Sequence, residues 1–171
     1  MPYAIHRGQR IHYAVTGDGP LVLLQHGFLS SGDSWVQSGA VAALADRYRV
    51  ACVDSLGHGQ SDKPTDAALY VQAQRAGDVA AVIDALGAER AHLVGYSMGG
   101  WMSVGVAKHV PQRLASLVVG GWNLFGSQAL RGAAARPDIE AFVANAAKHR
   151  PDLVAWITPE VKPCLQACLE A

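Results

Sequence analysis

One serine lies in a setting that could make it a nucleophile. Ser97 is the centre of the sequence Gly-Tyr-Ser-Met-Gly at positions 95–99, which follows a short apolar run and precedes a helix-favouring segment. A serine on a sharp turn from a strand to a helix is exposed above the sheet, and the helix N-terminus then faces the negative charge that develops on an attacked carbonyl group. The pattern therefore predicts a nucleophile elbow with Ser97 as the catalytic residue, built by Gly95, Tyr96 and Gly99.

Acyl-transfer chemistry also needs two backbone N–H groups that point at the oxyanion. In a nucleophile elbow, one of them belongs to the residue after the nucleophile, which here is Met98. The other comes from the loop after a preceding strand, where the sequence reads His26-Gly27-Phe28. We therefore expect an oxyanion hole formed by the amides of Phe28 and Met98, and a structural role for the His26 side chain.

The periodicity of apolar residues predicts the elements that position these groups. Continuous apolar runs predict strands that are covered on both faces of a sheet; they lie at 21–24, 50–53, 92–94 and 114–119. Helical spacing indicates helices between them, at about 41–45, 70–86 and 98–109. Two short runs at the start predict a β-hairpin over 3–6 and 10–16. This order predicts an α/β fold, a doubly wound and mostly parallel sheet with an N-terminal hairpin.

The alternation of strands and helices stops after residue 121. Residues 122–171 are rich in helix-favouring residues, and four prolines interrupt them. The sequence therefore predicts a core at 1–121 and a separate helical segment at 122–171. The strand at 114–119 would then lie at the edge of the sheet, where unpaired backbone groups and apolar side chains make it a candidate surface for self-association.

A third motif, Asp-Ser-Leu-Gly-His-Gly-Gln-Ser-Asp at 54–62, follows the second apolar run. Together with the motifs at 26–28 and 95–100, it resembles the α/β-hydrolase superfamily and its serine esterase-like branch. The resemblance covers the chain to about Trp122, and it implies that the 54–62 loop is mainly a shaped turn, with Asp54 and His58 as architectural residues. The helical segment resembles the beginning of the cap of this fold, so the resemblance implies a partial α/β-hydrolase fold.

The resemblance also implies a catalytic histidine and an acid, which follow the serine in the order Ser, acid, His. The last predicted strand is followed by Gly-Gly-Trp-Asn, without a carboxylate. The histidines after Ser97 are His109 and His149, and both are expected at the surface of helices. We therefore expect that the chain is a fragment of a longer protein and nearly inert alone, because loss of one member of such a triad can reduce turnover by roughly a million-fold.

The leading functional hypothesis is a serine hydrolase that acts on a small ester or other acyl substrate through a Ser97 acyl-enzyme. Apolar residues after 121 could line a pocket for an apolar substrate or pack the core of a cap: Leu124, Phe125, Phe142, Val143, Leu153 and Trp156. Alternatives of the same fold are a serine-dependent lyase like that of menaquinone synthesis, a carbon–carbon bond hydrolase, a cofactor-free perhydrolase and a non-catalytic ligand-binding pseudoenzyme. Dehalogenases and epoxide hydrolases of this fold need a carboxylate at the elbow, and Ser97 argues against both.

Composition excludes several other classes. Lys and Arg total 14 and balance 14 Asp and Glu, so we predict no nucleic-acid partner and no membrane partner. The spacing of Gly95, Gly99 and Gly100 does not fit a dinucleotide-binding motif. Cys52, Cys164 and Cys168 are expected as reduced thiols without a metal. No cofactor is expected, and the N-terminus lacks the pattern of a secretory signal, so the predicted location is cytoplasmic.

Overall fold

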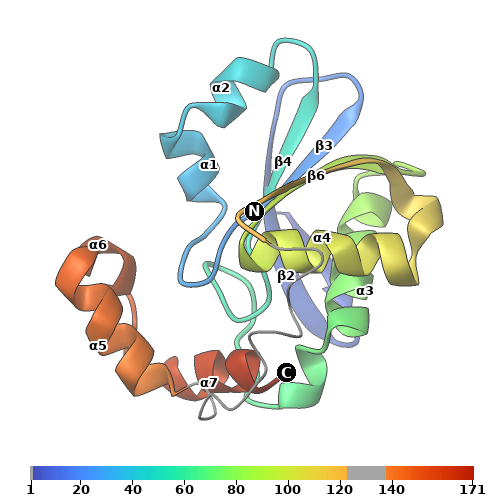
Figure 1. The fold of residues 1–171 in the computed structure, drawn as a ribbon. Coiled ribbons are helices and arrows are strands. Elements are labelled where there is room, and N and C mark those ends of the chain that lie inside the picture. Colours follow the sequence, from blue (N-terminus) through green and yellow to red (C-terminus); the bar gives the residue numbers. More distant parts are fainter. Residues whose placement is uncertain (1, 123–137) are drawn as a thin grey trace.

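The computed structural model describes residues 2–122 and 138–171. Its centre is a six-stranded sheet with the order β1-β2-β4-β3-β5-β6 (Figure 1). The strands are β1 (Tyr3–His6), β2 (Gln9–Thr16), β3 (Leu21–Gln25), β4 (Arg49–Val53), β5 (Ala91–Tyr96) and β6 (Leu114–Gly120). Strands β4, β3, β5 and β6 run parallel, whereas β1 and β2 form an antiparallel hairpin that joins the sheet at β4. The predicted fold class, a mostly parallel α/β sheet, is confirmed.

The N-terminal hairpin is tighter than the sequence predicted. Gln9 pairs with His6, so the turn consists of Arg7 and Gly8 alone. Both residues have positive φ angles, 51° and 76°, which is the backbone that a two-residue hairpin turn requires. Gln9 therefore belongs to β2 and not to the connecting loop.

Helices cover both faces of the sheet. They are α1 (Asp33–Gln37), α2 (Ala40–Leu44), α3 (Gln72–Ala85), α4 (Met98–His109), α5 (Ile139–His149), α6 (Pro151–Val154) and α7 (Lys162–Glu170), with 3-10 turns η1 (Ala67–Leu69) and η2 (Pro111–Arg113). Side chains of β3 alternate between two apolar clusters: Leu21 and Leu23 pack with α3 and α4, and Val22 and Leu24 pack with α1 and α2. This alternation follows from the strand period of two and fixes which helices cover which face.

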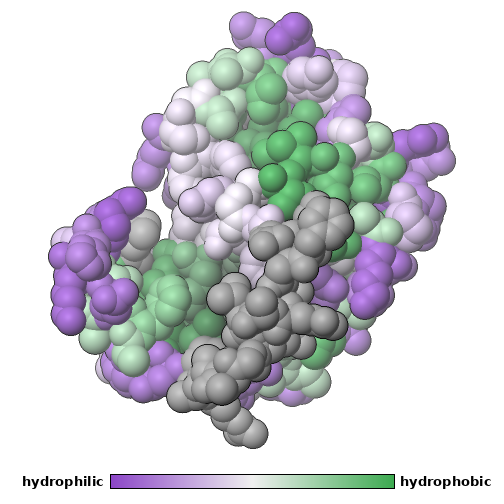
Figure 2. Space-filling view, in the orientation of Figure 1, coloured by the Kyte–Doolittle hydropathy of each residue, from purple (hydrophilic) through white to green (hydrophobic). Residues whose placement is uncertain are grey.

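Helices α5 to α7 stand beside the core as a separate arm (Figure 1). Their apolar side chains form a cluster of their own around Ile139 and Leu165, which meets the core at Leu29. The arm is hydrophilic outside and apolar toward the body of the molecule (Figure 2). Helix α7 also contacts the core where the Tyr70 hydroxyl lies 3.5 Å from the buried Cys164 Sγ. Among the described residues, no helix has the length and apolar character needed to cross a bilayer.

Strand β6 lies at the edge of the sheet, as the sequence predicted. Val118 on this strand is 57% exposed, and apolar side chains gather over the open part of the sheet next to β6 (Figure 2). An uncovered strand edge can pair with another chain, and a lysine on it opposes such pairing.

Replacing Val118 with lysine is therefore expected to reduce concentration-dependent self-association. The measurement is the average mass by sedimentation at increasing protein concentration. Val36→Lys is the matched control, because Val36 is 56% exposed but lies on α1, away from the edge. If Val118→Lys and the unmodified chain associate equally, the edge is not the surface involved.

Candidate active site

The backbone at Ser97 makes a strained turn between β5 and α4. Its φ and ψ angles are 52° and −115°, a conformation that costs a non-glycine residue on the order of 1–3 kcal/mol and persists only where surrounding contacts impose it. The Ser97 amide donates a hydrogen bond to the Gly120 carbonyl at 2.8 Å, which ties the turn to β6. The side chain is half-buried, so Ser97 is displayed at the end of the sheet and not enclosed in the core.

Two glycines allow the strand and the helix to come this close. A Cβ on Gly95 would collide with the Gly99 carbonyl, and a Cβ on Gly99 would collide with the Gln25 carbonyl of β3. The contacts join backbone to backbone, so no side-chain movement could relieve them. A nucleophile elbow at 95–99, as predicted from the sequence, needs such a close approach of strand and helix.

The loop after β3 packs directly against the elbow. A Cβ on Gly27 would lie 3.5 Å from the Ser97 Cβ and 3.3 Å from the Tyr96 ring. In the described part of the chain, the Phe28 amide makes no hydrogen bond. Met98 is the first residue of α4, so its amide has no acceptor within the helix. The two amides named for an oxyanion hole thus have no hydrogen-bond acceptor among the described residues.

The His26 side chain holds this loop in place. Its Nε2 atom accepts a hydrogen bond from the Ser55 amide at 3.0 Å, and its Nδ1 atom donates to the Gly27 carbonyl at 2.7 Å. Burial lowers the pKa of His26 to about 4, because the charged imidazolium is poorly solvated there. A neutral ring with both nitrogens engaged has a structural role and is a poor base for Ser97.

The low pKa of His26 links stability to pH. His26 contributes to the unfolding free energy above about pH 6.5, the pKa of histidine in the unfolded chain. This contribution is lost as the pH falls toward the pKa of His26 in the folded chain, because the unfolded chain then binds a proton that the folded chain does not. Between about pH 7.5 and about pH 5, the unmodified chain is expected to lose about 2 kcal/mol more unfolding free energy than His26→Gln. Glutamine can still accept from the Ser55 amide. Urea unfolding at both pH values measures this, and an equal loss in the two proteins would contradict it.

Asp54 and His58 shape the neighbouring loop. The Asp54 carboxylate accepts hydrogen bonds from the amides of Gly32 and Gln60, at 2.7 and 2.8 Å, and lies 2.9 Å from His12 Nδ1. His58 is fully buried, and its Nε2 atom accepts from the Leu29 amide at 3.3 Å. Burial also lowers the pKa of His58 well below its usual value. These contacts give both side chains the architectural roles that the resemblance implied.

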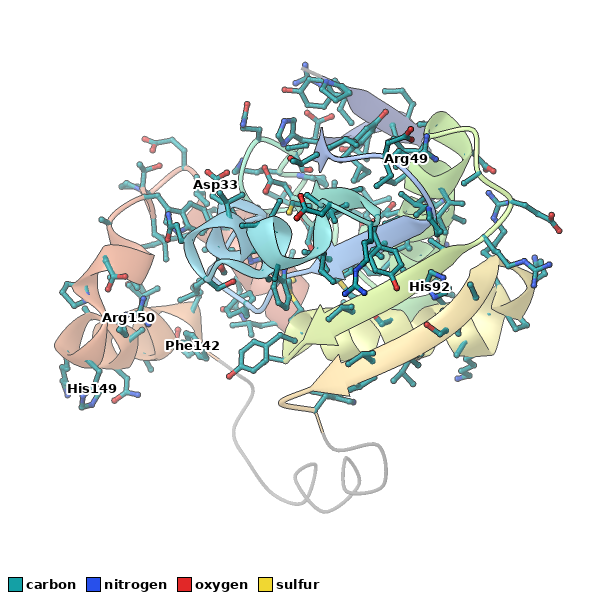
Figure 3. All side chains as sticks on the ribbon, turned by 90° about the horizontal axis from the view of Figure 1, so that it is seen from above. Asp33, Arg49, His92, Phe142, His149 and Arg150 are labelled. Carbon is teal, nitrogen blue, oxygen red and sulfur yellow. The ribbon has the colours of Figure 1, made fainter. Side chains whose placement is uncertain are left out.

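Within the described residues, no side chain hydrogen-bonds to the Ser97 hydroxyl. His109 ends α4 and His149 ends α5, and both are exposed; Figure 3 shows His149 pointing away from the molecule. The other histidines are engaged elsewhere: His6 with Asp78, His12 with Asp54, His92 with Ser116, and His26 and His58 as above. Residues 123–137 contain no His, Asp or Glu. A base for Ser97 is therefore not found among the described residues.

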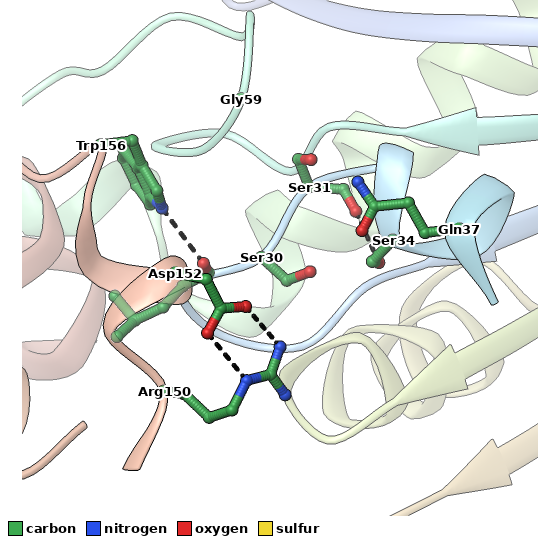
Figure 4. A pocket seen from close by; sticks show the side chains of 9 residues that line it. Ser30, Ser31, Ser34, Gln37, Gly59, Arg150, Asp152 and Trp156 are labelled. Atoms are coloured by element: carbon green, nitrogen blue, oxygen red, sulfur yellow. Dashed lines mark hydrogen bonds and ion pairs between the residues drawn. The ribbon is translucent and has the colours of Figure 1, made fainter. Parts of the chain in front are cut away.

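Two adjoining cavities lie between the core and the arm. They measure about 460 Å³ and about 330 Å³, and Ser30, Ser34 and Arg150 line both. The smaller cavity reaches the elbow through Gly27, Phe28 and Tyr96, although Ser97 itself is not among its lining residues. Figure 4 shows the larger cavity, with the Arg150–Asp152 ion pair on the side of the arm.

No group of three or more His, Cys, Asp or Glu side chains that could hold a metal occurs in the part of the chain described.

Residues 20–161 match the sequence model of the alpha/beta hydrolase fold family. The chain belongs to this family. A Bacillus subtilis protein assigned as a 2-succinyl-6-hydroxy-2,4-cyclohexadiene-1-carboxylate synthase is 33% identical over 64% of this chain and 40% of its own length. Epoxide hydrolase B of Mycobacterium tuberculosis is 38% identical over 66% of this chain and 32% of its own length. The solved structure of an N-acyl homoserine lactone degrading enzyme has a TM-score of 0.68 and 26% identity, and covers 99% of this chain and 66% of that one.

This α/β-hydrolase chain thus spans less than half the length of these two curated relatives. The fold and the relatives indicate a hydrolase-type enzyme family. The reactions named for the relatives differ, however, and range from epoxide opening to lactone degradation. Family membership therefore does not determine the reaction.

The apolar residues of the arm pack against one another and against the loop after β3. The Phe142 ring lies 5.2 Å from the Phe28 ring, and Val143 belongs to the same apolar cluster. Trp156 donates to the Leu29 carbonyl at 3.2 Å and also lines the larger cavity. Leu124, Phe125 and the Leu153 side chain lie outside the described residues. The polar cavity wall at Ser30, Ser31, Ser34 and Gln37 was not predicted, although the hydroxyl-rich run at 30–38 was a signal for it.

Proposed function

We propose that this α/β hydrolase acts on a small ester or other acyl substrate through a Ser97 acyl-enzyme. The observation that carries the proposal is the strained turn at Ser97 at the N-terminus of α4, with the loop of Gly27 packed against it. The strained backbone at Ser97 costs free energy, and contacts elsewhere in the fold must compensate for it to keep the hydroxyl in this position. The adjacent amides of Phe28 and Met98 can stabilise the oxyanion, and one such donor is worth roughly 3–4 kcal/mol.

The reaction would take two steps. The Ser97 oxygen attacks the carbonyl carbon, a base removes the hydroxyl proton and passes it to the leaving alcohol, and an acyl-enzyme results. Water then attacks the acyl group, releases the carboxylic acid and returns the proton to Ser97. No described histidine hydrogen-bonds to Ser97, so the proposed mechanism leaves the base and its orienting acid unassigned.

The serine at position 97 supports acyl chemistry over the epoxide hydrolysis named for several relatives. A lactone is a cyclic ester, and one structural neighbour is described as degrading a lactone. A serine stands at the elbow where the epoxide hydrolases of this fold need a carboxylate. The second candidate is a serine-dependent lyase, which the 33% identity to the Bacillus subtilis synthase favours.

The cytoplasmic location and the division into 1–121 and 122–171 remain predictions.

A fluorophosphonate probe tests the proposal, with imidazole added as an external base. A covalent adduct on the chain, seen as a mass increase, is the expected result for a serine hydrolase. Absence of an adduct, combined with a rise in melting temperature on adding an acyl ligand, would instead favour a non-catalytic binding protein. If esters are not hydrolysed although the adduct forms, the lyase becomes the better assignment.

A further inference from the structure

The two cavities beside the elbow form one cleft with different ends. Ser30, Ser34 and Arg150 border both cavities, and Figure 2 shows the surface hollowed between α5–α6 and the core. The elbow end is bounded by Tyr96 and Phe28. A substrate that reacts at the elbow can therefore extend its remaining atoms into the larger cavity.

The core side of the far end is a wall of hydrogen-bonding side chains. Ser30, Ser31, Ser34 and Gln37 stand on this wall, opposite the arm (Figure 4). Of the side chains described, none hydrogen-bonds to the Ser30 or Ser31 hydroxyl or to the Gln37 amide. The Ser34 hydroxyl donates to the Ser31 carbonyl at 2.7 Å, so it can still accept a hydrogen bond.

The charges that border the cleft cancel. Among its described lining residues, Arg150 and Asp152 are the charged ones, and they form a two-pronged pair at 2.9 and 2.7 Å. His26 at the elbow end is neutral near pH 7, because burial lowers its pKa to about 4. An anionic ligand would have to compete with Asp152 for the guanidinium, and a cationic ligand would have to compete with Arg150 for the carboxylate.

Apolar surface completes the far end. Leu29 and the Trp156 ring lie beside the polar wall. A purely alkyl group would satisfy these two residues but would cover the serine hydroxyls and the Gln37 amide without replacing their hydrogen bonds to water. Covering an unpaired polar group weakens binding by roughly fivefold or more.

We propose that the far end of the cleft binds a neutral hydrogen-bonding group, an amide or a hydroxyl, carried by the substrate away from its reacting carbonyl. The preferred substrate class is therefore a neutral acyl compound with a polar group in its chain, and neither a simple alkyl ester nor a dicarboxylic monoester. This inference rests on the proposed function for the position of the reacting carbonyl.

The test measures binding to the Ser97→Ala variant, which cannot consume the ligand by attack through Ser97. Dissociation constants are obtained from chemical-shift titrations with three ethyl esters: N-acetyl-β-alanine ethyl ester (amide), ethyl hexanoate (alkyl) and monoethyl glutarate (carboxylate). We expect the amide ester to bind roughly 3- to 10-fold more tightly than the other two, which corresponds to one or two net hydrogen bonds. Adding Ser31→Ala and Gln37→Leu should remove this advantage, because the amide ester loses its hydrogen-bonding partners and the alkyl ester no longer covers unpaired polar groups.

The matched control is Ser116→Ala with Gln112→Leu. These substitutions make the same two chemical changes at exposed positions that do not line the cleft. Equal or tighter binding of the alkyl or the carboxylate ester, no saturable binding of any ester, or an unchanged preference in the Ser31/Gln37 double variant would overturn the inference. The phosphonate adduct at Ser97 does not depend on Ser31 or Gln37. An adduct without amide preference would therefore reject the polar far end alone, and amide preference without an adduct would reject the hydrolase.

Discussion

Replacing Ser97 with alanine is expected to reduce the imidazole-supported hydrolysis of 4-nitrophenyl acetate to the rate of imidazole alone. No described histidine hydrogen-bonds to Ser97, so in the proposed mechanism added imidazole would act as the base, and the protein would supply the nucleophile and the oxyanion donors. In a complete triad, loss of the serine costs roughly a million-fold in turnover. When added imidazole is the base, Ser97→Ala is expected to lose the whole part of the hydrolysis rate that depends on the protein. The rate is measured by release of 4-nitrophenolate.

Ser116→Ala is the control that isolates the elbow. The Ser116 hydroxyl lies 2.8 Å from His92 Nδ1 on the exposed part of β6, so it has a histidine partner but no strained turn. Its variant should keep the full rate. Retention of the rate by Ser97→Ala, or its loss in Ser116→Ala, would show that reactivity follows an ordinary serine–histidine contact and not the elbow.

The second large effect is expected from Gly99→Ala. The new methyl group would collide with the Gln25 carbonyl, so β3 and α4 would have to separate. We expect a loss of about 3 kcal/mol or more in unfolding free energy, since the overpacking is against backbone. Urea unfolding provides the measurement, and the same variant should lose the phosphonate adduct.

Gly120→Ala is the matched control for this substitution. A Cβ on Gly120 would lie 3.5 Å from the Tyr96 ring, which is an ordinary contact, so its cost should stay near 1 kcal/mol or below. Comparable destabilisation by the two variants would mean that the close approach of β3 and α4 does not determine the elbow.

Features that depend on neighbouring residues were predictable from the sequence. The elbow is built by five consecutive residues, and the glycines that permit it flank the serine directly. The strands were recognisable because their apolar runs are covered on both faces, as β3 shows with all five of its residues buried. The edge position of β6 followed from its place as the last strand before the helical segment.

Features that depend on packing between distant segments were not predictable. The cleft joins the wall at 30–37 to Arg150 and Trp156, and the hydrogen bond from Trp156 to Leu29 spans 127 positions. Arg75 is another example, because a charged residue on a helix is usually exposed. Here it is fully buried and donates to the Leu56 carbonyl at 2.7 Å. The periodicity of apolar residues predicts which face of a helix is buried. It does not predict which polar side chain will donate a hydrogen bond to a buried carbonyl group of a distant loop.

A crystal structure of the phosphonylated chain would locate both the modified oxygen and the amide groups around it. We expect phosphorus bonded to Ser97 Oγ, with a phosphonyl oxygen roughly 2.7–3.1 Å from the amide nitrogens of Phe28 and Met98. An adduct on another side chain, or a phosphonyl oxygen directed away from both amides, would contradict this expectation.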